Sequence, residues 1–213
     1  MRMSLQGFWG NGVALDFVNG DFVDITGWTV LAQQIKLNGR TNIGGWDTPL
    51  DTKLPPHPVG DNTTLSGQTF GSEFVTSNLP PGFSSPSRAL RLYNNGVVNV
   101  AYGIAHGPAV ISDQSVRIIA GSTVEFWWRA YGSTDAYDIY GYLLNIDTGS
   151  TIELINETGP NDTGLTSWAL SSKIIPAGIS GDYKFVFVSG SYDFTGGQAY
   201  GASLLITGVR VSS

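Results

Sequence analysis

The chain of 213 residues contains no cysteine and only two histidines. Without cysteine it can form neither disulfide bonds nor thiolate metal sites, so packing alone must stabilise the fold. The two histidines, His57 and His106, do not form a metal-binding pair such as HExxH, and no nucleophile elbow, phosphate loop or dinucleotide-binding motif occurs. The sequence therefore predicts a non-catalytic protein without an organic cofactor.

Charge is also scarce. Charged residues make up 13% of the chain, whereas ordinary soluble domains have about 25%. The net charge is −6, and the 11 lysines and arginines are scattered along the sequence. Because binding to a phosphate backbone needs clustered basic side chains, nucleic acid is not an expected partner.

Long apolar runs are absent as well. No segment approaches the roughly 18 consecutive apolar residues of a membrane span. The N-terminal segment, residues 1–9, lacks the continuous apolar stretch of a signal peptide. We therefore expect synthesis in a cytosol, no cleaved signal peptide and no insertion into a membrane.

What the sequence does contain is a series of short segments rich in Val, Ile, Tyr, Phe and Trp, bounded by Gly, Asn, Asp and Pro. This pattern is typical of β-strands, whereas helical periodicity is nearly absent. The predicted strands cover residues 13–18, 28–37, 73–75, 88–93, 97–104, 109–111, 115–119, 123–131, 137–145, 151–156, 167–174, 183–189 and 202–211.

Two of these segments indicate where the core lies. In residues 123–131 apolar side chains alternate, so that one face of the strand is predicted to be core. The two faces carry Val124, Phe126 and Trp128 on one side and Glu125, Trp127 and Arg129 on the other. The second half of residues 182–188 is apolar on both faces, which predicts a strand in the middle of its sheet.

The whole chain, residues 1–213, is predicted to form one all-β domain, a two-sheet antiparallel sandwich. Residues 39–86 contain seven prolines among Gly, Asn, Thr and Ser, and this composition predicts a long loop excursion rather than the centre of a sheet. Residues 1–12 form either an arm that packs on a neighbouring molecule or a cover for the edge of the domain's own core.

Three carboxylates follow predicted strands: Asp135 and Asp138 after one, and Asp193 after another. If both loops lie at the same end of the sandwich, these oxygens could share a Ca²⁺ ion, the one cofactor that the sequence suggests. The alternative is that the three aspartates cap tight turns. A glycoside hydrolase would instead need two facing carboxylates across a cleft, a geometry that sequence cannot show.

The aromatic residues, 12% of the chain, can serve either as core or as flat platforms for sugar rings and partner proteins. Trp28 and Trp128 are better candidates for the core. The candidate ligand-binding residues are Trp46, Trp127, Arg129, Tyr137 and Tyr140.

Several segments resemble known jelly-roll modules. Residues 19–22 (Asn-Gly-Asp-Phe) and 26–29 (Thr-Gly-Trp-Thr) are similar to the opening of carbohydrate-binding modules. Residues 120–130, 135–145, 181–193 and 201–206 resemble a β-sandwich module of bacterial surface adhesins. The resemblance implies a jelly-roll fold of the galactose-binding, carbohydrate-binding-module type. In such modules a terminal strand often carries a calcium-binding Asp, but Thr207 stands in that place here.

A free-standing, cysteine-free, Gly/Asn/Thr-rich jelly roll also resembles virion proteins of tailed phages, including cyanophages. This resemblance implies a non-catalytic virion structural protein, such as a head-decoration, fibre or tail-associated protein. The expected partners are then other virion proteins and further copies of the same chain in a homo-oligomer, at the virion surface. The alternative is a carbohydrate-binding or adhesin module that recognises surface glycans at a cell surface.

Overall fold

The computed structural model describes residues 14–15, 19–37, 41–49, 65–66, 69–98, 102–159 and 167–212. Strands and turns make up these residues, and they contain no helix, so none that could span a membrane. The predicted all-β class is therefore confirmed. The predicted arm, residues 1–12, and His57 lie outside the described residues.

The strands, with their bounds, are as follows. They are β1 (Ala14–Leu15), β2 (Trp28–Leu31), β3 (Asn42–Ile43), β4 (Trp46–Asp47), β5 (Leu65–Ser66), β6 (Phe70–Val75), β7 (Ala89–Val98), β8 (Ile104–Ser112), β9 (Val116–Ile119), β10 (Thr123–Gly132), β11 (Ala136–Asn145), β12 (Thr151–Thr158), β13 (Ala169–Ile174), β14 (Ser180–Tyr192) and β15 (Ala199–Ser212).

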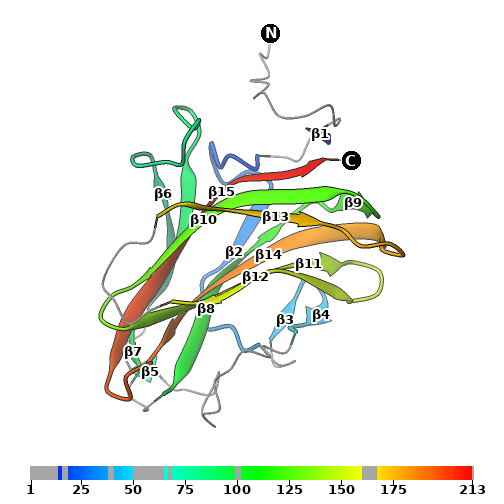
Figure 1. Ribbon diagram of the computed structural model, residues 1–213. Coiled ribbons are helices and arrows are strands. Elements are labelled where there is room, and N and C mark those ends of the chain that lie inside the picture. Colours follow the sequence, from blue (N-terminus) through cyan, green and yellow to red (C-terminus); the bar gives the residue numbers. More distant parts are fainter. Residues whose placement is uncertain are drawn as a thin grey trace.

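Two antiparallel sheets form the sandwich (Figure 1). The seven-stranded sheet has the order β13-β10-β15-β7-β5, with β6 also paired to β7 and β1 to β15. The six-stranded sheet has the order β12-β11-β14-β8-β2, with β9 also paired to β14. The apolar strand at residues 182–188 thus lies inside its sheet between β11 and β8, as its two apolar faces predicted.

The main core lies between the two sheets. Phe126 and Phe187, one from each sheet, are fully buried, and their ring centroids are 4.9 Å apart. Trp28 is 3% exposed and packs on Phe187 at 6.3 Å. Burying side chains of this size stabilises the fold by roughly 1.5–3 kcal/mol each. The inward face predicted for residues 123–131 is confirmed, because Val124 and Phe126 are buried and Trp128 packs against the same core.

A second apolar cluster covers the outer face of the six-stranded sheet. Its members come from the segment after β2, from β3 and from the outward side of three central strands; they are Ile35, Leu37, Ile43, Ala109, Ile111, Tyr140, Tyr142, Leu144, Val186 and Val188. Leu31 and Trp46 pack against it. The β3–β4 hairpin therefore closes this face, and every described residue of β8 and β11 is buried.

The predicted loop excursion at residues 39–86 contains more strand than expected. Its described parts include β3, β4 and β6, and the backbone of β5 pairs with β7. The strand predicted at residues 97–104 is not continuous, since β7 runs on to Val98 and β8 begins at Ile104. Gly107 allows β8 to lie close to the segment after β2, because a Cβ at Gly107 would lie 2.3 Å from the backbone oxygen of Gln33.

Candidate functional site

The outer face of the seven-stranded sheet carries a band of arginine and tyrosine side chains. Directly opposed residues of antiparallel strands project from the same face. The register places Arg129, Leu205, Arg91 and Glu73 in one row across β10, β15, β7 and β6. The next row is Tyr131, Ser203, Tyr93 and Gly71. Strands from three separate parts of the chain, β6 with β7, β10 and β15, thus build one largely polar and aromatic surface.

Arg91 is the best-held side chain of this surface. Its Nη1 donates to Glu73 Oε1 at 2.6 Å, and its Nε donates to Ser203 Oγ at 3.0 Å. The guanidinium carbon lies 5.0 Å from the ring centroid of Tyr93 and 5.5 Å from that of Tyr131. Both distances are within the range of cation–π attraction. These four contacts, two hydrogen bonds and two cation–π contacts, orient the guanidinium plane before any ligand arrives, because a guanidinium presents its donors in a rigid fork.

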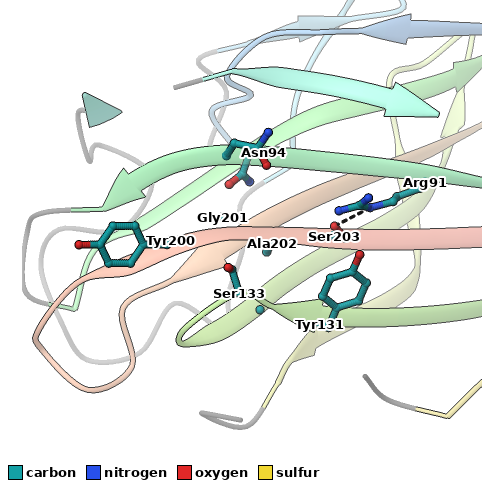
Figure 2. Close-up of a pocket in the computed structure, with 10 residues that line it drawn as sticks. Arg91, Asn94, Tyr131, Ser133, Tyr200, Gly201, Ala202 and Ser203 are labelled. Atoms are coloured by element: carbon teal, nitrogen blue, oxygen red, sulfur yellow. Dashed lines mark hydrogen bonds between the residues drawn. The ribbon is translucent and has the colours of Figure 1, made fainter. Parts of the chain in front are cut away.

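A hollow of about 360 Å³ opens beside Arg91, and we call it the Arg91 hollow (Figure 2). It is lined by Arg91, Asn94, Asn95, Tyr131, Gly132, Ser133, Tyr200, Gly201, Ala202 and Ser203. In Figure 2, β15 runs between Arg91 and Tyr131, and the ring of Tyr200, itself a β15 residue, lies toward one end of the hollow. The Tyr200 side chain is 43% exposed, and its hydroxyl donates to Gln198 Oε1 at 2.5 Å.

Backbone contacts between β15 and the turn after β10 shape the floor of the hollow. The Ser133 amide donates to Gly201 O at 3.1 Å, and the Tyr200 amide donates to Thr134 Oγ1 at 3.1 Å. Gly201 has a φ of +64°, and a Cβ there would lie 2.3 Å from Asn94 O. A residue without a side chain is needed at this position, since both the backbone conformation and the close approach disfavour any other.

Trp127 and Arg129 lie on this same outer face, as predicted, but not in the hollow. The Trp127 ring is half-buried beside Gly208 and Phe83. Arg129 lies 5.9 Å from the ring centroid of Trp168, and burial lowers the pKa of its guanidinium. Side chains of neighbouring segments thus cover this half of the face, whereas the half around Arg91 is hollowed.

The other three predicted ligand-binding residues lie on the six-stranded sheet or its cover. Tyr137 is 6% exposed and Tyr140 is 4% exposed, so neither ring offers a face to an external ligand. The Trp46 ring is half-buried against Gly149, and its Nε1 donates to Ile146 O at 3.1 Å. Trp46 therefore fixes the β3–β4 hairpin to the turn after β11.

The three predicted calcium-binding aspartates separate into two groups. Asp138 is buried and its Oδ2 lies 2.6 Å from His106 Nε2, while its Oδ1 accepts a hydrogen bond from Thr158. Asp135 and Asp193 lie next to each other at the end of β14. Among the described residues, no group of three or more His, Asp or Glu side chains is arranged to hold a metal.

Sequence reasoning did not single out Arg91, Tyr131 or Tyr200. The predicted strands at residues 88–93 and 123–131 contain the first two, and the signal that could have found them is the alternation of Arg91 with Leu90 and Leu92 and of Tyr131 with Ala130. What the sequence lacks is any signal that β7 and β10 lie on either side of β15. Only this order of strands places Arg91 between Tyr93 and Tyr131.

The fold and the hollow together define a two-sheet antiparallel β-sandwich with an arginine–tyrosine hollow on the outer face of its seven-stranded sheet. No family model matches this sequence, and no curated protein does. Among solved structures, a family 61 carbohydrate-binding module in complex with β-1,4-galactotriose is similar, with 13% identity, 92% of this chain and 95% of that chain covered, and a TM-score of 0.43.

Two further similar structures are a bacterial carbohydrate-binding module and a domain of a bacteriophage tailspike. The family 11 carbohydrate-binding module of Clostridium thermocellum, in complex with a β-1,3-1,4-mixed-linked tetrasaccharide, has 8% identity, 93% coverage of each chain and a TM-score of 0.42. The enzymatically active domain of tailspike protein 4 from bacteriophage CBA120 has 14% identity and a TM-score of 0.39, with 92% of this chain and 21% of that chain covered. These similar structures include the class of module that the sequence resembles.

Proposed function

We propose that this protein binds a glycan in the Arg91 hollow. The observation that carries the proposal is the arrangement of Arg91 between Tyr93 and Tyr131, opposite the exposed ring of Tyr200. A sugar ring has apolar C–H faces that pack on an aromatic ring and hydroxyl groups that need fixed hydrogen-bond partners. The hollow supplies both kinds of group on one rigid sheet face.

The hydrogen-bonding capacity of the lining suits hydroxyl groups. A guanidinium has five N–H donors, of which Arg91 uses one on Glu73 and one on Ser203, leaving three for a ligand. Ser133 adds a hydroxyl and Asn95 an exposed side-chain amide. The volume of about 360 Å³ is near the lower end of the roughly 300–1,000 Å³ of small-molecule sites, which suits a short stretch of a sugar chain.

We propose binding rather than cleavage. Hydrolysis of a glycosidic bond generally uses two carboxyl groups that flank the bond. The described residues that line the hollow include neither Asp nor Glu. Both oxygens of Asp138 already bond to His106 and Thr158 beneath the surface, so this carboxylate does not face a ligand.

The experiment that tests the proposal is a glycan array followed by titration of the best ligand into the wild-type chain and into Tyr200→Ala. Because an aromatic platform adds about 1 kcal/mol, we expect the variant to bind roughly 5- to 10-fold more weakly. Leu170→Ala is the matched control, since this side chain is 49% exposed on β13 of the same sheet but does not line the hollow. No binding to any neutral or uronic-acid glycan on the array, or an equal loss of affinity in Tyr200→Ala and Leu170→Ala, would contradict the proposal.

A place in a phage virion remains a second proposal, and the surface feature that favours it is an apolar sheet edge. Leu170 and Ile174 on the edge strand β13 are 49% and 70% exposed. Exposed apolar side chains on an edge strand suit contact with another chain. Mass spectrometry of purified particles tests this proposal; recovery of the protein only in the free fraction after lysis would reject it. Glycan binding and a virion location are compatible.

A further inference from the structure

The two carboxylates Asp135 and Asp193 are brought together by strand pairing. Asp135 precedes β11 and Asp193 follows β14. The register pairs Ala136 with Tyr192, so the next residues outward are the two aspartates. Asp135 is 1% exposed and Asp193 is 0% exposed. Two acidic groups are therefore buried side by side at the end of the six-stranded sheet.

Asp193 has no partner that compensates for its burial. Neither of its carboxylate oxygens makes a hydrogen bond, and neither aspartate belongs to an ion pair among the described residues. Burial, and after it the proximity of Asp135, raises the pKa of Asp193. The backbone amides of Gly196 and Gly197 act in the opposite direction and lower this pKa. A buried, unpaired carboxylate is costly, so it needs either a proton or a cation.

Asp135 is better satisfied than Asp193 but has oxygen lone pairs left. Its Oδ1 accepts from the Ala136 amide at 2.9 Å, and its Oδ2 accepts from Thr195 through the amide at 3.2 Å and the hydroxyl at 2.9 Å. A carboxylate offers about four lone-pair sites. These contacts hold Asp135 in place while leaving it able to bind a cation together with Asp193.

From this geometry we infer that Asp135 and Asp193 bind a single Ca²⁺ ion, with backbone carbonyl oxygens and water completing the shell. Calcium takes six to eight hard oxygen ligands in flexible geometry, which suits two carboxylates within a loop. Softer transition metals are not favoured, because the chain has no cysteine and the nearby His106 is bonded to Asp138. This position differs from the terminal-strand calcium position of adhesin modules. In this chain Thr207 stands at that terminal-strand position, and its hydroxyl donates to Arg88 O at 2.7 Å.

The inferred calcium position is connected to the Arg91 hollow by a few residues of backbone. Ser133 and Thr134, which precede Asp135, hold Gly201 and Tyr200 through their hydrogen bonds. Asp193 opens the loop that leads to Gln198 and Tyr200. A bound ion would therefore fix both the turn after β10 and the start of β15. If the proposed glycan binding holds, chelation should also weaken it.

The test of the calcium inference does not depend on glycan binding. The full chain is first treated with EGTA at neutral pH to remove bound calcium. Its melting temperature is then measured with and without added CaCl₂. At free calcium about 100 times Kd, a ligand of the folded state raises the melting temperature of a chain of this size by roughly 5–10 °C. We expect that rise in the wild type and in Asp147→Asn, a control at the opposite end of β11. In Asp193→Asn the rise should be absent.

A second measurement keeps the inference testable if Asp193→Asn fails to fold. Terbium, which replaces calcium at oxygen sites, should luminesce when Tyr192 beside the two aspartates is excited, and added Ca²⁺ should quench this signal by competition. Three results would overturn the inference. The first is a wild-type melting temperature that changes with neither Ca²⁺ nor EGTA, which is the result expected if the two carboxyl groups share a proton instead. The second is an equal rise in melting temperature with Mg²⁺, and the third is an undiminished rise with Ca²⁺ in folded Asp193→Asn.

Discussion

Arg91→Ala should weaken glycan binding about 30- to 100-fold, corresponding to roughly 2–3 kcal/mol, the range of a binding hot spot. Arg91 lines the hollow and keeps three N–H donors for a ligand, so the substitution removes those donors directly. It also removes the cation that both Tyr93 and Tyr131 flank. The rings then lose the contact that orients them, and Glu73 loses its ion pair.

Isothermal titration with the best glycan from the array measures this loss. Arg91→Lys should recover only part of the affinity, because an ammonium keeps the charge but not the planar fork. Arg117→Ala, which removes an exposed arginine on the other sheet, is the control and should bind like the wild type. Fold stability should change little, since the Glu73 partner of Arg91 is half exposed and such pairs contribute at most about 1 kcal/mol. Unchanged affinity in Arg91→Ala would place the ligand elsewhere.

His106→Ala should lower the free energy of unfolding by about 3–5 kcal/mol, because it removes a large buried side chain and leaves the Asp138 carboxyl without this hydrogen-bond partner. His106 is fully buried and Asp138 is 2% exposed, and the 2.6 Å contact between them links β8 with β11 across β14. Without the imidazole, Asp138 remains buried with only the Thr158 hydroxyl as a side-chain partner.

Urea denaturation followed by tryptophan fluorescence measures this change. Asp138→Asn should cost less, because an amide of nearly the same shape can still bond to both His106 and Thr158. Thr29→Ala is the surface control, since its hydroxyl only bonds the side chain of Asp113, and it should change stability by less than about 1 kcal/mol. A loss below about 1 kcal/mol for His106→Ala would mean that the buried pair does not stabilise the fold.

Much of the fold could be predicted because alternation along a strand reports burial directly. Period-two spacing predicted that one face of residues 123–131 is core, and on the face that proves to be core Val124 and Phe126 are fully buried. The apolar faces of residues 182–188 likewise placed that strand inside its sheet. In each case the local pattern and the tertiary environment agree, so no long-range information was needed.

The candidate platforms were harder to place because the sequence does not show what covers the second face of a sheet. Tyr137 is buried because it packs into the main core between the two sheets. Tyr140 looks like a surface aromatic when the six-stranded sheet is assumed to have one open face. The segment that contributes Ile35, Leu37 and Ile43 closes that face instead. Tyr140 is thereby packed into the second apolar cluster, whereas the Arg91 hollow lies on the outer face of the seven-stranded sheet.

The calcium prediction for the three aspartates depended on where two loops lie in the fold. Asp135 and Asp193 were expected to share an ion only if their loops lie at one end of the sandwich, and the pairing of β11 with β14 meets that condition. Asp138 is different, because a buried histidine from β8 engages it. Sequence spacing could not reveal this partner, which is 32 residues away. Calcium binding itself stays a prediction.

The most direct test of the account maps the glycan on the protein by NMR, using ¹⁵N-labelled chain and the oligosaccharide that the array selects. The account predicts that amide shifts concentrate around the Arg91 hollow, at residues 91–95, 131–133 and 200–203, with little change in the β3–β4 hairpin. Shifts centred on Trp46 and its hairpin, or spread over the molecule without saturation, would contradict it.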